Sequence, residues 1–263
     1  MTGSCPLALE QTTETHLPPK YKNPPVIEAL IFIGVVPSTS PIERLEAVVP
    51  GVPIRYPNRQ SVAQTGFTID LQNPKEATTT AQQLGYSYSD ETNTRVVQIR
   101  RDGFVFSRLT PYPYSGWDEW TAEAIGLWNR YKEVVSPQSV NLLQVRYANR
   151  IRIPQLRFLP QEYLNAYPWI STALPPMNGF VLRVEFPAPT IPGARLVINQ
   201  GTLYDPTEPQ TASILLDLEV SKSGVELEPK DPNVWQTIEE LHRLETSAFE
   251  ACITDKSREV FNR

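Results

Sequence analysis

The feature that most constrains the fold of this chain is a pattern that occurs twice: alternating strands followed by one long amphipathic helix. In the first helix, predicted from "SGWDEWTAEAIGLWNRYKEVV", apolar residues recur on one stripe, and Ser115 and Asp118 are placed as a capping pair. In the second, predicted from "DPNVWQTIEELHRLETSAFEACI", Asp231 is the expected cap and Pro232 the first helical residue. Each helix must bury its apolar stripe against another element, and the strands provide one.

Alternating apolar and polar residues predict the strands themselves. They are expected at residues 26–36, in a three-stranded meander within 85–109, at 140–153, and at "FVLRVEF", "ARLVINQ" and "ASILLDLEV". Asp102-Gly103 is a dipeptide that hairpin turns prefer, so the meander is expected to reverse there, with Ile99 opposite Phe106. From residue 50 to 84 only one weak strand, "GFTIDL", is expected.

The sequence therefore predicts an α+β protein of two similar halves, each an antiparallel sheet with one long amphipathic helix packed on it. The expected domains are a flexible N-terminal arm at 1–23, a first α+β unit at 24–154 and a second at 155–263. The first strand is apolar on both faces, which predicts a central strand covered on both sides. A short helix is expected at "SPIERLEAVV", with Ser40 as its cap.

Composition excludes several classes of protein. A net charge of −5 gives no global attraction to nucleic acid or anionic membranes. No apolar run reaches the roughly 18 residues that a membrane-spanning helix needs, so a cytoplasmic protein is expected. Two Cys and two His, all far apart, predict neither a disulfide framework nor a metal site. Phosphate-binding glycine loops and the G-x-S-x-G pattern are absent from the sequence, so no cofactor and no catalytic residue is predicted.

Glu28 is the one carboxylate inside the apolar first strand. A buried carboxylate without a partner is too costly to remain ionised, so a cation is expected beside it. Arg108 interrupts an apolar face of the meander in the same way. We therefore predict a structural ion pair between Glu28 and Arg108, with Arg146 or Arg150 as the substitute partner.

Arginines along the strand at 140–153 form the stronger functional signal. Arg146, Arg150 and Arg152 share one strand face, and Arg100 is a further candidate. Their guanidinium groups suit either phosphates or an acidic surface of a partner protein. The alternative is an ordinary solvated face with ion pairs worth about 1 kcal/mol or less each.

Two further groups of residues are candidates for a site. Aromatic residues at the junction of the meander and the first helix are candidates for a ligand pocket, with core packing favoured: Phe104, Phe106, Tyr112, Trp117 and Trp120. Asp217 and Glu219 lie two apart on one strand face and could act as an acid/base pair, but a solvated outer face is favoured because the opposite face is apolar.

Four segments resemble a sporadically distributed family of uncharacterised bacterial proteins: "PPVIEA", "GFVFSRLTPY" with a following Trp, "VRYANRI" and "LHRLETSAFEACITD". The resemblance extends from Pro24 to about Phe261. It implies family-like positions at Pro25, Glu28, Ala29, Phe106, Arg108, Leu109, Tyr112, Trp117, Arg146, Tyr147, Asn149, Arg150, Phe249, Ile253 and Thr254. The resemblance implies no activity. The patchy distribution of the family among bacteria fits accessory proteins of mobile elements, toxin-antitoxin systems or phage defence.

The sequence offers few candidate catalytic residues, and the predicted sheets and helices offer broad surfaces. Both favour a non-enzymatic binding or adaptor protein acting through a protein partner. Two alternatives stay open. One is a small-ligand module with the aromatic pocket under a helix; the other is RNA or DNA binding through the arginine strand, which is less favoured. Oligomeric state and partner identity do not follow from the sequence.

Overall fold

The fold is described from a computed structural model, which defines residues 20–37, 41–49, 56–69, 77–110, 116–171, 173–175, 177–208 and 210–263. Its strands are β1 (Val26–Val36), β2 (Asn58–Ile69), β3 (Ala77–Ser89), β4 (Arg95–Arg100), β5 (Gly103–Leu109), β6 (Ser139–Ile153), β7 (Val181–Pro187), β8 (Ala194–Leu203) and β9 (Ala212–Leu227). Its helices are α1 (Trp117–Val135), α2 (Asn233–Cys252) and α3 (Asp255–Phe261), with short 3-10 turns η1 (Ile42–Val48) and η2 (Pro160–Glu162).

All nine strands form one antiparallel sheet, in the order β2-β3-β4-β5-β1-β6-β9-β8-β7. The α+β class is confirmed. The centre of the sheet is the pair β1 and β6, and β6 also pairs with β9 along its length. The two predicted halves therefore share one continuous sheet. β1 lies beside β5, the last strand of the four-stranded meander β2–β5, and β6 lies beside β9, the last strand of the three-stranded meander β7–β9.

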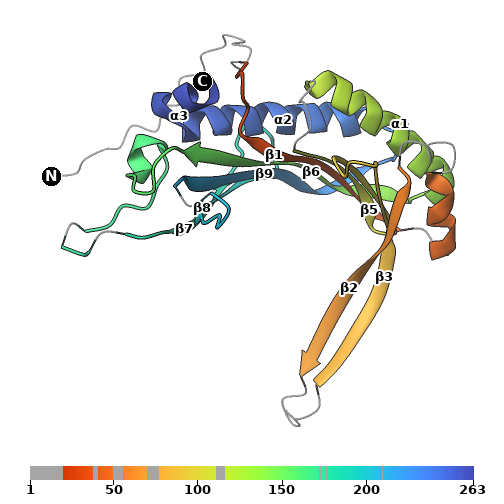
Figure 1. Ribbon diagram of the computed structural model, residues 1–263. Coiled ribbons are helices and arrows are strands. Elements are labelled where there is room, and N and C mark those ends of the chain that lie inside the picture. The colour runs from red at the N-terminus through yellow and green to blue at the C-terminus, as the bar shows by residue number, and fades with distance from the viewer. Residues whose placement is uncertain are drawn as a thin grey trace.

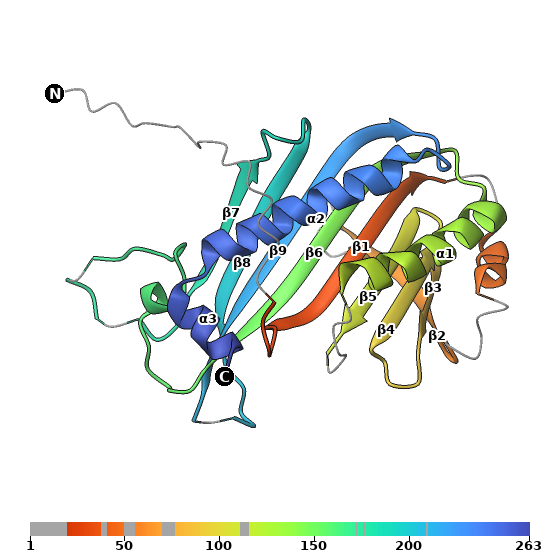
Figure 2. The ribbon, with the colours of Figure 1, turned by 90° about the horizontal axis from the view of Figure 1, so that it is seen from above.

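The helices α1 and α2 lie on the same face of this sheet (Figures 1 and 2). The strands turn their most apolar faces toward them, as Ile31 on β1, Val145 on β6 and Leu218 on β9 illustrate by being fully buried. The expected apolar stripes of the two helices are confirmed: Trp128 on α1 and Leu241 on α2 are also fully buried. Burial of these side chains between helix and sheet supplies the main driving force for the fold.

The opposite face of β1 corrects a prediction. β1 is central in the sheet, as expected, but among the described residues no helix covers its second face. Leu30 and Phe32 on that face are only partly buried. Side chains of the neighbouring strands cover much of Leu30 and Phe32. Apolar residues can therefore occupy this face without a second layer of helices.

The turn between β4 and β5 lies one residue earlier than the sequence predicted. Arg100 pairs with Gly103, and Phe104, not Phe106, lies opposite Ile99. A Cβ on Gly103 would come within 2.4 Å of the Phe32 ring and 2.7 Å of the Ile33 carbonyl oxygen. This glycine is thus needed for close approach to β1 within the strand and not for the turn.

The segment from residue 50 to 84 was predicted to be mostly irregular, and this was wrong. β2 and β3 pair from Asn58 with Ser89 to Ile69 with Ala77. In Figure 1 this hairpin extends away from the rest of the sheet, on the side opposite to the helices. Ser, Thr, Gln and Asn make up about half of its sequence, so the hydrophobic alternation that signals a half-buried strand is weak there.

Two predictions at the chain and helix starts fall partly outside the described residues. These are residues 1–19 of the expected arm and the expected caps Ser40 and Ser115. Residues 20–23 are not free: the Tyr21 hydroxyl donates to Glu250 on α2 at 2.7 Å, and the Asn23 amide donates to the carbonyl of Phe261 on α3 at 2.8 Å.

Candidate functional site: the open face of the sheet

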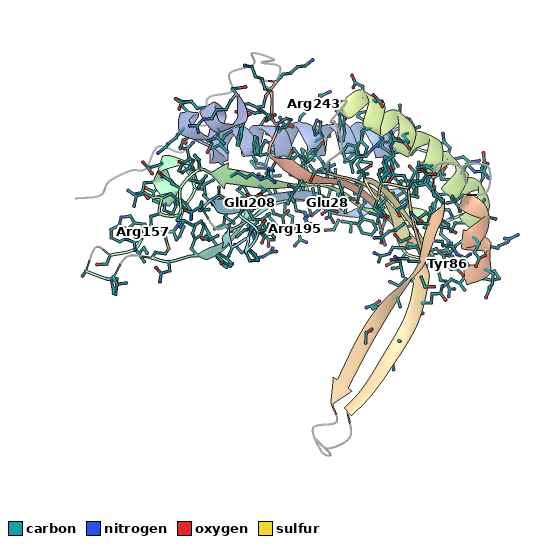
Figure 3. All side chains as sticks on the ribbon, viewed as in Figure 1. Glu28, Tyr86, Arg157, Arg195, Glu208 and Arg243 are labelled. Atoms are coloured by element: carbon teal, nitrogen blue, oxygen red, sulfur yellow. The ribbon has the colours of Figure 1, made fainter. Side chains whose placement is uncertain are left out.

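We call the side of the sheet that faces away from α1 and α2 the open face. Figure 3 places Glu28, Arg195 and Glu208 on this side and Arg243 of α2 on the other. On β6 the open face carries Arg146, Arg150 and Arg152, as predicted, because the intervening residues point into the core.

Arg146 is the centre of a charged cluster on the open face. Its Nε and Nη2 atoms donate to the two carboxylate oxygens of Asp217 on β9 at 2.7 and 3.0 Å. Glu28 lies on its other side, with its carboxylate 3.5 Å from Nη1. Asn199 on β8 also donates to Asp217, at 3.5 Å. The hydrogen bonds to Asp217 raise the pKa of Arg146 above its ordinary value, so this guanidinium is firmly charged.

This geometry corrects the predicted ion pair between Glu28 and Arg108. In the β1 and β5 register Ala29 faces Arg108, while Glu28 faces Leu109. Successive side chains point to opposite faces, so Glu28 lies on the open face and Arg108 in the core. The substitute partner Arg146 takes its place. Arg108 instead donates to Glu123 of α1 at 2.5 Å.

Arg150 forms a second cluster on the same strand face. It donates to Asp205 at 3.0 Å, to Glu208 at 3.4 Å and to the Ser213 hydroxyl at 3.0 Å. Arg152 lies 3.7 Å from Glu208 and is mostly exposed. Asp205 and Glu208 belong to the loop between β8 and β9, so this loop folds back to neutralise the arginines.

Arg100 lies on the open face of β4, apart from the other three. It forms a salt bridge with Asp102 at 2.6 Å, and its guanidinium lies 5.6 Å from the centre of the Phe32 ring. A guanidinium over an aromatic ring is attracted by the ring's negative face. Arg100 therefore shields part of the apolar surface of β1.

The predicted acid/base pair at Asp217 and Glu219 is part of the same face. Asp217 is buried and bound by Arg146 and Asn199, whereas Glu219 is partly exposed and lies opposite Arg146 in the ladder. The apolar residues between them face the core, as expected. The structure thus gives Asp217 a position in an ion pair.

The predicted aromatic pocket is filled by the rings themselves. Phe104, Phe106 and Trp120 are buried, and Phe106 stacks on Trp120 with their centres 6.2 Å apart. Trp117 packs edge-on against Trp120 at 5.2 Å. Tyr112 lies outside the described residues. Two shallow hollows, one beside residues 224–228 and one beside 185–195, are lined by other residues.

Polar clusters in the core were missed in the sequence. Glu123 accepts from Tyr56 at 2.7 Å and from Arg108, with Arg95 3.9 Å away. The sequence does contain a sign that Glu123 faces the core: it lies three residues after Trp120 and four before Leu127, on the apolar stripe of the helix. Glu245 similarly interrupts the stripe of α2. Burial raises its pKa well above the ordinary 4.5.

His242 of α2 is a buried titratable residue at the contact between α1 and α2. It stacks on Trp117 of α1 with ring centres 3.7 Å apart, and the Trp117 indole donates to Glu239. Burial lowers the pKa of His242 from 6.5 to about 4, with Arg243 adding to the effect. The imidazole is therefore neutral at pH 7, as suits a packing residue between two helices.

Comparisons with known proteins add no assignment, since neither a protein-family model nor a curated protein matches the chain. Within the described residues there is no group of three or more His, Cys, Asp or Glu side chains placed to hold a metal ion. None of the described helices has the length and apolar character to cross a membrane.

Proposed function

We propose that this protein is a non-enzymatic binding or adaptor protein whose open sheet face receives a protein partner. The observation that carries this proposal is the mixture of groups on that face. Partly exposed apolar side chains, Leu30, Phe32 and Leu215, lie among arginines that are already paired with carboxylates of the same chain. Such a surface suits protein association, in which apolar contact and directed ion pairs act together.

Charge favours a protein over a nucleic acid as the partner. Five carboxylates surround the three arginines of β6 on or beside this part of the face: Glu28, Asp205, Glu208, Asp217 and Glu219. Nucleic-acid affinity depends on unneutralised cations that displace counterions from phosphates. A phosphate would have to compete with carboxylates that already hold Arg146 and Arg150.

Shape supports the same proposal. The β2 and β3 hairpin projects on the side of the open face and forms a wall at one end of it (Figure 1). A partner on the open face would then contact both the sheet and the hairpin. Such an arrangement enlarges the buried area beyond that of a flat sheet, toward the roughly 1,600 Å² of a stable interface.

The test is affinity purification of the full chain from its native host, followed by mass spectrometry. We expect a stoichiometric protein partner that is retained by the wild-type chain and lost from the double variant Gln144→Lys, Arg152→Glu. Both substitutions alter the open face of β6 without touching the core. The matched control is Arg243→Glu on the solvent side of α2, which should retain the partner.

Two outcomes oppose the proposal: no stoichiometric protein with the wild-type chain, or a partner that the open-face variant binds as well as the control does. Binding of RNA or DNA that weakens steeply with salt would support the nucleic-acid alternative instead. From the family resemblance we further propose that the protein is an accessory of a bacterial defence or toxin-antitoxin system, and the identity of the captured protein tests this.

We also propose that the sheet consists of two similar units. Each unit has a central strand, a meander whose last strand pairs with it, and a long helix; the meander has four strands in the first unit and three in the second. The strand order favours a boundary between α1 and β6, which places β6 with the second unit, whereas the sequence suggested residue 154. A partner contacting β1 and β6 would then sit where the two units meet.

A further inference from the structure

The sheet ends at β7, whose outer edge is not paired with any strand in the described part of the chain. Its inner neighbour is β8. The Ala188 amide donates to the carbonyl of Ala194, and the Phe180 carbonyl accepts from the amide of Thr202. In an antiparallel ladder such bonds recur at every second residue, so the even-numbered residues bond to β8. The N–H and C=O groups of Arg183 and Glu185 therefore point to the free edge.

β7 carries two opposite charges on its open face, two residues apart. Arg183 and Glu185 are both exposed, and their side chains lie 3.9 Å apart at the closest. Exposed edge strands commonly carry charges that repel a second strand. Here the two charges have opposite signs, so a second copy of the strand in antiparallel orientation meets a complementary pattern.

We propose that β7 pairs with β7 of a second copy of this chain, antiparallel and centred on Val184, joining two nine-stranded sheets into one. In this register Arg183 lies opposite Glu185 of the second copy, and Glu185 opposite its Arg183. Both are positions whose backbone groups point outward, so each pair exchanges two hydrogen bonds. A two-fold rotation axis relates the two sides of the contact, as in the common type of homodimer interface.

Neighbouring registers are disfavoured by charge. If the two β7 strands were centred on Arg183, the Arg183 side chains of the two copies would lie opposite each other. If they were centred on Glu185, the two Glu185 carboxylates would do so. Like charges directly opposite are destabilising, while opposite charges stabilise. A shift by one residue would place outward-facing backbone groups against inward-facing ones. The sequence of β7 therefore selects a single register.

Apolar residues complete the proposed contact. On the helix side of the sheet Leu182 lies opposite Phe186 of the second copy, and the two Val184 side chains face each other. Val181, whose side chain is 90% exposed, lies opposite Pro187 of the second copy, at the rim of the hollow beside residues 185–195. Pro187 has no N–H, so this outermost pair has one hydrogen bond and limits the ladder.

The segment from residue 156 to 204, which includes β7 and β8, lies at the end of the molecule where β7 forms the edge (Figure 2). Among the described residues, all large exposed hydrophobic side chains except Ile125 fall between residues 156 and 204: Leu156, Leu159, Tyr167, Trp169, Ile170, Leu174, Val181, Phe186 and Tyr204. Exposed apolar surface concentrated in one region marks association sites. A second copy is the occupant that both the charges of β7 and its backbone direction fit.

Sedimentation velocity on the full chain over a concentration series tests this proposal. We expect the wild-type chain to form a dimer that does not grow further. Arg183→Glu and Glu185→Arg should each weaken the dimer about tenfold or more, because every copy then meets a like charge twice. The double variant with both substitutions restores the opposite charges and should restore the dimer. Circular dichroism checks that each variant is folded.

Glu185→Pro provides a second arm, since it removes an outward-pointing N–H that the monomer does not use, and should give a folded monomer. The open-face variant of β6, Gln144→Lys with Arg152→Glu, should leave the dimer intact, which separates this proposal from the proposed function. A monomeric wild-type chain, a dimer that the charge swap fails to restore, or assembly that continues beyond a dimer would overturn it.

Discussion

At the scale of single residues, the buried ion pair between Arg108 and Glu123 is the most consequential contact between β5 and α1. Arg108 is 4% exposed, and Glu123 also receives the hydroxyl of Tyr56. Glu123→Gln should lower the free energy of unfolding by about 3 to 5 kcal/mol, because it removes a carboxylate from beside a buried guanidinium. Urea denaturation measures this, and Glu119→Gln on the exposed side of α1 is the control. A loss below about 1 kcal/mol would contradict it.

Glu245 gives a prediction with a defined pH dependence. Burial raises the pKa of Glu245 in the folded chain above the ordinary value of 4.5. Between the pKa of the unfolded chain and that of the folded chain, the folded chain therefore holds a proton that the unfolded chain releases. Stability therefore falls as pH rises above about 4.5, by up to about 1.4 kcal/mol per pH unit until the folded pKa is reached. Glu245→Gln should flatten this slope and stabilise the protein at pH 7. Melting temperatures over pH 4 to 9 check it, and an unchanged slope would refute it.

At the scale of elements, the stack of Trp117 on His242 joins α1 to α2. The pKa of His242 is lowered from 6.5 to about 4, so in this window the unfolded chain binds a proton that the folded chain does not. Stability should therefore fall as pH drops from 6.5 to 4, by on the order of 3 kcal/mol in total. His242→Phe keeps an aromatic ring and should remove most of this loss. Denaturation monitored by tryptophan fluorescence measures it; a variant as acid-sensitive as the wild type would argue against it.

The approach of β5 to β1 depends on Gly103. Gly103→Ala should cost about 1 to 3 kcal/mol, since the added methyl group meets both the Phe32 ring and the backbone of Ile33. Gly126→Ala is the matched control: nothing lies within 4 Å of its Cβ position in α1, and alanine favours helix, so a gain of about 0.5 to 1 kcal/mol is expected. Equal stability of the two variants in thermal denaturation would contradict the role of Gly103 in the approach of β5 to β1.

At the scale of the whole molecule, β6 connects what the sequence presented as two halves. It pairs with β1 and with β9 over most of its length. We therefore expect a single cooperative unfolding transition, with coincident denaturation curves from far-UV circular dichroism and from tryptophan fluorescence. Two separated transitions would instead indicate units that fold independently.

The sequence predicted most strands and both long helices because their apolar residues keep a period of 2 or 3.6. Of β2 and β3, only the parts within the predicted strands at 66–71 and 85–89 were expected, because the many Ser, Thr and Gln residues elsewhere in the hairpin show no apolar alternation. The arginine face of β6 was predicted from the same period. The preferred partner of Glu28, Arg108, was wrong, and Arg146 was named only as a substitute, since pairing depends on register and a shift of one residue moves a side chain to the opposite face. The loop residues that hold Arg150 follow no local pattern.

The position of β6 also has a consequence for synthesis. β6 leaves the ribosome well before β9, so its edge lacks its eventual neighbour while residues 154–211 are being made. A nascent chain that stalls in this interval presents a long unpaired strand to other chains, which is a template for aggregation. Incomplete translation products of this protein should therefore be more aggregation-prone than the finished chain.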